Sequence, residues 1–124
     1  MMQTLAIAGG GAIGALLRFW MSTGIYNLLG RGFPYGTLVV NVAGSLLMGF
    51  LYILLIEKLS LGPVWRAALL IGLLGAFTTF STFSIETLNL MEAGELLKAF
   101  LNILLSVVLC LLAAWIGVLA GRTV

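Results

Sequence analysis

Four long apolar stretches constrain the fold of this chain more than any other feature of its sequence. They cover residues 4 to about 26, 36–56, 67 to about 90 and 97–120. An α-helix needs about 20 predominantly apolar residues to cross the hydrocarbon core of a bilayer, and each stretch is long enough. Only 8% of the residues are charged, compared with about 25% in soluble domains. We therefore expect an all-α membrane protein with four transmembrane helices.

The connections between these stretches are short and contain turn-forming residues. Gly30 and Pro34 lie in the first connection, Gly62 and Pro63 in the second, and Gly94 in the third. Short connections place successive helices antiparallel, so the sequence predicts an up-down-up-down bundle that forms a single domain over residues 1–124. The strands of a membrane β-barrel would alternate apolar with polar residues, and no stretch of this chain does so.

The sequence contains few residues that could serve catalysis or metal binding. The sequence has no His and a single cysteine, Cys110, within an apolar run. This composition excludes a disulfide within one chain and a Cys/His metal site. No pair of carboxylates lies deep in a span to act as general acid and base, and no nucleotide-binding motif occurs. We expect no enzyme activity, and we expect membrane lipid rather than nucleic acid around the chain.

Basic residues are balanced across the expected membrane. Three of the six fall on or point toward each side: Lys58, Arg66 and Arg122 on one, and Arg18, Arg31 and Lys98 on the other. Lys and Arg near the span ends set orientation, so an even count gives the chain no strong reason to insert one way. Both orientations could coexist and pair as an antiparallel, dual-topology homodimer. The alternative is that another feature fixes the topology and that six charges are too few to count.

Polar side chains within a span are costly, and each is a functional candidate. On the second span, Asn41 shares one helical face with Gly44, Ser45 and Met48. Asn41 lies too deep to reach the interface, so its amide serves either a hydrogen bond to a neighbouring helix or contact with a transported species. A second polar track, with members four residues apart, indicates a wetted wall on the fourth span: Asn102, Ser106 and Cys110.

The third span contains the segment GAFTTFSTFSIE, from Gly75 to Glu86. Glycine and a run of Thr and Ser residues make a poor continuous helix, so we expect a break within residues 75–80. A break at membrane depth is tolerated only where it is buried in protein or lines a wet cavity. It would free carbonyl groups suited to a cation in the first half-helix and amide groups suited to an anion in the second.

The same segment places Phe77, Phe80 and Phe83 three residues apart. Aromatic side chains at helical spacing in a membrane usually serve packing. The alternative is that their electropositive ring edges face an anion. Ring edges combined with hydroxyl and amide donors would attract a small anion without binding it too firmly for conduction.

Three motifs resemble one family of bacterial membrane proteins: GALLRF at 14–19, YGTLVVNVAGSLLMG at 35–49 and GLLGAFTTFSTFSIE at 72–86. They are similar to the bacterial fluoride channels called Fluc or CrcB, and the fourth span is compatible in length and polarity. The resemblance implies an antiparallel dual-topology homodimer in the bacterial inner (plasma) membrane, with two fluoride pathways and a structural Na⁺ ion at the dimer axis. It also implies passive export of toxic cytoplasmic fluoride.

The resemblance further implies roles for individual residues. Asn41 would be a pore-lining amide donor, and Phe80 and Phe83 would contact fluoride through their ring edges. The backbone carbonyls of Gly75 and Thr78 would hold the Na⁺ ion. The other implied positions are the hydroxyl donors Ser81 and Thr82, the acid Glu86 toward one end, the fourth-span residues Asn102 and Ser106, and the vestibule arginine Arg18. Relatives commonly begin the fourth-span track with a tyrosine, where this chain has Asn102.

Two other functional classes are alternatives. A proton-coupled drug exporter of the small multidrug-resistance type also has four spans and antiparallel pairing, but it depends on a carboxylate in the first helix. The first span here has none, and Glu86, the only acid within a span, lies near the end of its own. A structural subunit or membrane enzyme is the third class, and it lacks acid–base residues at depth.

Overall fold

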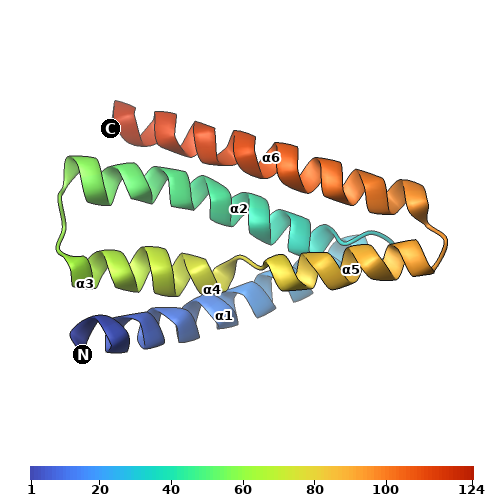
Figure 1. Cartoon of the computed structure of the whole chain (residues 1–124), viewed down its shortest axis with the longest axis horizontal. Helices are drawn as coiled ribbons and strands as arrows, with labels where there is room; N and C mark the ends of the chain where they lie inside the picture. Colours follow the sequence, from blue (N-terminus) through green and yellow to red (C-terminus); the bar gives the residue numbers. More distant parts are fainter.

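Four helical spans, each antiparallel to the one before it, make up the computed structural model, which describes residues 1–124 (Figure 1). Each span is long and apolar enough to cross a membrane. The first, second and fourth are α1 (Met2–Leu29), α2 (Tyr35–Tyr52) continued by the π-helix η1 (Ile53–Lys58), and α6 (Leu96–Thr123). The predicted all-helical protein with four membrane-spanning helices is confirmed, and both chain ends lie at the same end of the bundle.

The third span is assembled from several segments. It begins with Pro63 at the first position of α3 (Pro63–Arg66), where the missing N–H of proline would have no helical partner anyway. The π-helix η2 (Ala67–Leu74) and one short turn, α4 (Gly75–Phe77), follow. Two residues later α5 (Phe80–Glu92) completes the span, and Figure 1 shows the unwound ribbon between α4 and α5.

Close helix packing depends on glycines that face a neighbouring backbone. A Cβ atom at Gly14 of α1 would collide with the carbonyl oxygen of Leu73 in η2. A Cβ atom at Gly49 of α2 would collide in the same way with the carbonyl of Ala114 in α6. Small residues at these positions let the backbones approach closely.

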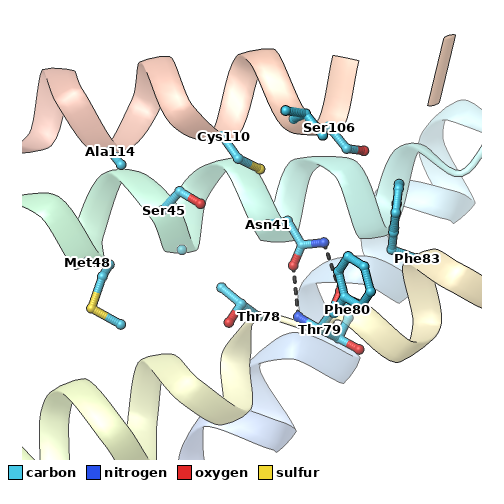
Figure 2. Close-up of a pocket in the computed structure, with 12 residues that line it drawn as sticks. Asn41, Ser45, Met48, Thr78, Thr79, Phe80, Phe83, Ser106, Cys110 and Ala114 are labelled. Atoms are coloured by element: carbon cyan, nitrogen blue, oxygen red, sulfur yellow. Dashed lines mark hydrogen bonds between the residues drawn. The ribbon is translucent and has the colours of Figure 1, made fainter. Parts of the chain in front are cut away.

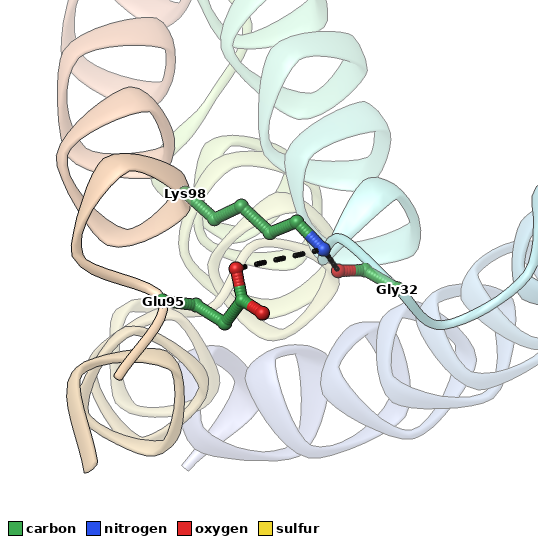
Figure 3. Close-up of polar contacts among 3 residues, drawn as sticks. All are labelled: Gly32, Glu95 and Lys98. Atoms are coloured by element: carbon green, nitrogen blue, oxygen red, sulfur yellow. Dashed lines mark hydrogen bonds and ion pairs between the residues drawn. The ribbon is translucent and has the colours of Figure 1, made fainter. Parts of the chain in front are cut away.

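Polar contacts join α6 to other segments at both ends of the bundle. At one end Lys98 Nζ donates to the carbonyl of Gly32 over 3.2 Å and lies 3.9 Å from the Glu95 carboxylate (Figure 3). At the other end Lys58 Nζ donates to the carbonyl of Arg122 over 3.2 Å. Ion pairs at the surface contribute only about 0–1 kcal/mol, so the bundle is held mainly by helix packing.

The outer surface of the bundle is strongly apolar. Only 21 of the 124 residues are buried, and the exposed aromatic side chains include Phe19, Trp20, Trp65 and Trp115. Soluble monomers rarely expose apolar patches larger than a few hundred Å², whereas lipid accepts such a surface. The chain is therefore a multi-pass membrane protein.

Candidate functional site

Two extended residues between α4 and α5 are the centre of the candidate site. Thr78 has φ −85° and ψ 158°, and Thr79 has φ −150° and ψ 123°. Thr78 Oγ1 donates to the carbonyl of Leu74 over 3.0 Å, and Thr79 Oγ1 accepts from the backbone amide of Thr82 over 3.2 Å. Short hydroxyl side chains compete in this way with helical backbone bonds. They also cap a new helix, so Thr79 serves as the N-cap of α5.

The interruption at Thr78 and Thr79 leaves backbone groups without helical partners. The last carbonyls of one helix and the first amides of the next have no partner inside their own helix. The carbonyl of Thr78 accepts no hydrogen bond. The carbonyl of Ala76 accepts one, over 3.0 Å, from Nε of Arg18 in α1. Free carbonyls carry a partial negative charge that suits a cation, and the start of α5 carries a partial positive charge that suits an anion.

Asn41 of α2 contacts the interruption through both ends of its amide (Figure 2). Its Oδ1 accepts from the backbone N–H of Thr79 over 2.8 Å, and its Nδ2 donates to the backbone carbonyl of Thr79 over 3.0 Å. The amide nitrogen carries two N–H groups, so one remains after this pairing. Asn41 therefore joins α2 to the third span and keeps one donor.

A cavity of about 410 Å³ lies beside the interruption. None of the residues that line it is charged. They are Asn41, Gly44, Ser45, Met48, Thr78, Thr79, Phe80, Phe83, Ser106, Val107, Cys110 and Ala114 (Figure 2). The whole predicted face of the second span takes part, and so do two members of the fourth-span track. Polar groups from three spans thus converge on one uncharged cavity.

The three phenylalanines of the third span separate into two environments. Phe77 is buried, with 7% of its surface exposed, whereas Phe80 is 78% exposed. The rings of Phe80 and Phe83 both line the cavity; their centroids are 5.4 Å apart and their planes are inclined by 41°. Tilted pairs of this kind are favoured by the ring quadrupole. Phe77 serves packing, and the other two rings are available to the cavity.

Other predicted site residues lie outside the cavity wall. The hydroxyls of Ser81 and Thr82 cluster at the start of α5, 3.4 Å and 3.1 Å from Thr79 Oγ1. Gly75 is exposed at the outer surface of the bundle. Arg18 is half-buried and is tied to the backbone of Ala76.

Asn102 is buried between α5 and α6 with only 1% of its surface exposed. Its Nδ2 donates to Thr87 Oγ1 over 2.8 Å, and its Oδ1 accepts from Ser106 Oγ over 3.4 Å. Because Ser106 lines the cavity, this chain of hydrogen bonds leads from the buried amide to the cavity wall.

Glu86 lines a second cavity of about 270 Å³, together with Tyr26, Arg31, Pro34, Asn89 and Leu90. The hydroxyl of Tyr26 donates to Glu86 Oε2 over 2.8 Å, while Oε1 is buried without a hydrogen bond. The guanidinium of Arg31 lies 4.5 Å from the centre of the Tyr26 ring. One oxygen of the Glu86 carboxylate thus links α5 to α1, and the other has no hydrogen-bond partner.

Sequence reasoning did not single out Thr79, Tyr26 and Thr87. Thr79 is one of several hydroxyl residues in a run, and nothing local distinguishes the one that Asn41 binds. Tyr26 and Thr87 pair with residues 60 and 15 positions away, and no local pattern indicates such partners.

The four spans and the uncharged polar cavity define a helical membrane protein built like channels and transporters, which place such cavities between their helices. Within this class, the chain belongs to the CrcB family: the family model described as CrcB-like protein, Camphor Resistance (CrcB), matches residues 5–118.

The chain is similar over nearly its whole length to proteins named fluoride-specific ion channel FluC. It is 60% identical over 121 residues to the protein of Methylococcus capsulatus, an alignment that covers 98% of the chain and 53% of that protein. It is 54% identical over 122 residues to the protein of Coxiella burnetii (strain Dugway), covering 98% of both. It is 56% identical over 117 residues to the protein of Shewanella amazonensis, covering 94% of both. The chain thus spans about half the length of the first relative and nearly all of the other two.

Proposed function

We propose that the chain is a passive, fluoride-selective ion channel that lets toxic fluoride leave the bacterial cytoplasm. The observation that carries the proposal is the uncharged polar cavity beside Thr78 and Thr79, in a chain whose relatives are named fluoride-specific channels. Fluoride is small and tightly hydrated, so a pore must replace its water with strong donors. A Lys or Arg deep in the path would hold the anion, whereas conduction requires sites that also release it.

The proposed pathway follows the wall of this cavity. Asn41 and Ser106 supply an amide and a hydroxyl donor, and Phe80 and Phe83 supply ring edges. Further proposed positions are Ser81 and Thr82 at the electropositive start of α5, Asn102 behind Ser106, and Glu86 toward one end. The positive charge of Arg18 would raise the local concentration of anions in a vestibule.

We also propose that a structural Na⁺ ion is held by the backbone carbonyls of Gly75 and Thr78. Carbonyl oxygens are hard ligands of the kind that hard cations prefer. The Thr78 carbonyl accepts no hydrogen bond and Gly75 is exposed, so the donor set fits a cation at the surface of the chain. Two oxygens do not fill a cation's shell, and a second chain would supply the rest.

The second chain in this proposal is another copy in the opposite orientation, forming an antiparallel dual-topology homodimer in the inner membrane. The even distribution of six basic residues supports dual insertion. The apolar outer surface supports pairing within lipid. Each copy would bring its own cavity, which gives two fluoride pathways.

Passive transport suits the direction of the proposed flux. Fluoride enters cells as the neutral acid and dissociates inside, where it is trapped as the anion. A fluoride-selective leak lets the membrane potential drive the anion out, so no energy source is required.

The drug-exporter alternative gains no support from the structure. The first span, α1, contains no carboxylate, and Glu86 of the third span is bonded to Tyr26. The relatives described above carry the name of a channel.

Reconstitution into liposomes tests the proposal. Liposomes loaded with fluoride or chloride are treated with a potassium ionophore to collapse the potential, and ion-selective electrodes follow the efflux. We expect rapid fluoride release with negligible chloride release. Absence of fluoride release from folded protein would overturn the proposal, and the same liposomes should then be tested for proton-coupled uptake of a cationic drug.

A further inference from the structure

We infer that Asn41 is a positioning residue. By binding both backbone groups of Thr79, it keeps Thr79 extended and so maintains the interruption between α4 and α5. The two hydrogen bonds, 2.8 Å to Oδ1 and 3.0 Å from Nδ2, use the N–H and the C=O of a single residue. The consequence for fluoride flux rests on the proposed function, but the structural claim does not.

The pairing is specific for an extended Thr79. In an α-helix the N–H and C=O of one residue point in opposite directions along the axis. In a strand they point to the same side, where an antiparallel partner strand bonds both. The Thr79 angles, φ −150° and ψ 123°, are those of an antiparallel strand. One carboxamide can therefore reach both groups only while Thr79 stays extended.

Asn41 thus takes the place of a partner strand within a helical bundle. Without it, the N–H and C=O of Thr79 would lack partners inside the protein, and unsatisfied backbone groups at membrane depth are costly. The segment would satisfy them by winding into helix between α4 and α5. Winding would also pair the carbonyls and amides that the interruption now leaves free.

Arg18 of α1 bonds the backbone on the N-terminal side of the interruption. Its Nε donates to the carbonyl of Ala76, two residues before Thr78. The interruption is therefore bonded by α1 just before it and by α2 within it, and Figure 2 shows the two bonds of Asn41. Asn41 bonds an extended residue directly, whereas Arg18 does not, so Asn41 is the residue that selects the extended conformation of Thr79.

The test is an NMR measurement of Thr79 in fluoride-free micelles, on protein labelled with ¹³C and ¹⁵N at threonine. The Cα chemical shift of Thr79 distinguishes extended from helical backbone. We expect an extended value in the wild type and a displacement toward the helical value in Asn41→Ala. Loss of two hydrogen bonds corresponds to a change of about thirtyfold in the ratio of extended to helical Thr79. Asn41→Asp keeps the oxygen that accepts from Thr79 and should retain more of the extended form.

Asn89→Ala is the matched control, because Asn89 is an exposed asparagine whose side chain makes no hydrogen bond. It should leave the Thr79 shift unchanged. An unchanged Thr79 shift in folded Asn41→Ala would overturn the inference.

A second measurement decides the case in which Asn41→Ala does not fold. Wild-type protein labelled at asparagine and threonine should give a through-space cross-peak between the Asn41 carboxamide and the Thr79 carbonyl, and its absence overturns the inference. Neither measurement contains fluoride. A wild-type protein that shows the cross-peak but releases no fluoride from liposomes would count against the proposed function alone.

Discussion

The hydroxyl of Tyr26 donates a 2.8 Å hydrogen bond to Oε2 of Glu86, although the two residues are 60 positions apart in the chain. The bond joins α1 to α5, and Thr37 of α2 lies 3.3 Å from the same hydroxyl. Glu86, the acid that lies deepest within its span, is therefore part of a contact among three spans. A proton-coupled exporter would need this carboxylate to exchange its proton during transport, whereas a channel would not.

The substitution Glu86→Gln separates these two classes. Glutamine keeps an oxygen that can accept from Tyr26 and removes the charge. We expect passive fluoride efflux to persist, with a rate changed by up to about fivefold, because one unit charge at 4 Å in water contributes about 1 kcal/mol. Electrode recordings of fluoride release from liposomes measure this rate. Complete loss of transport in Glu86→Gln, together with proton-driven drug uptake by the wild type, would favour the exporter.

Replacing either cavity phenylalanine should lower fluoride flux sharply. An isoleucine in place of Phe80 or Phe83 has no electropositive ring edge, and an interaction of about 1.4 kcal/mol lost at the ion corresponds to about tenfold slower flux. The same efflux recordings give the rate, and chemical cross-linking checks that the proposed homodimer still forms.

Phe100→Ile is the control for these two variants. Phe100 lies on α6, is 58% exposed and does not line the cavity, so its replacement should leave flux at the wild-type rate. Normal flux in both Phe80→Ile and Phe83→Ile would remove the proposed role of the ring edges.

Two glycines of α1 should respond oppositely to the same substitution. A Cβ at Gly14 would collide with the Leu73 carbonyl, whereas nothing lies within 4 Å of a Cβ at Gly24. Gly14→Ala should lower the free energy of unfolding by about 1–3 kcal/mol, the cost of overpacking. Gly24→Ala should raise it by about 0.5–1 kcal/mol, because alanine loses less entropy in a helix. Denaturant titration in mixed micelles, followed by tryptophan fluorescence, measures both. Equal effects would show that the close approach of α1 and η2 does not limit stability.

The spans and the polar face of α2 could be predicted because both depend on local patterns. Apolar length alone identifies a membrane helix, and helical spacing alone places Asn41, Gly44, Ser45 and Met48 on one side. The structure brings all four to the cavity. Small residues spaced four apart, such as Gly10 and Gly14 or Ser45 and Gly49, are a local pattern of the same kind. At Gly14 and Gly49 the structure leaves no room for a Cβ atom.

The pairings between helices could not be predicted, because they depend on the relative height and rotation of two spans. Asn102, Ser106 and Cys110 share one spacing, yet Asn102 points to Thr87 and is fully buried while Cys110 lines the cavity. The same limit applies to Asn41, for which the sequence left a helix contact and an ion contact equally open. Its contact with the backbone of Thr79 follows only from the extended conformation of that residue.

The bond from Arg18 to Ala76 leads to a prediction that separates the charge of the arginine from its geometry. Arg18→Met removes both, and it should lower the free energy of unfolding by about 2 kcal/mol, the contribution of a hydrogen bond to a charged group. Arg18→Lys keeps the charge but lacks the planar guanidinium, so its stability should fall nearly as far.

Arg18→Met and Arg18→Lys should differ in fluoride flux, although their stabilities should be similar. Attraction of anions depends on charge and is strongest at low salt, so Arg18→Lys should conduct faster than Arg18→Met in dilute buffer, with the difference shrinking as salt is added. Arg122→Met is the control, because Arg122 is exposed and its side chain makes only a surface ion pair with Glu57. This variant should change stability by less than about 1 kcal/mol. If Arg18→Met is as stable as the wild type, the bond to Ala76 contributes nothing to the fold, and any loss of flux then belongs to the charge alone.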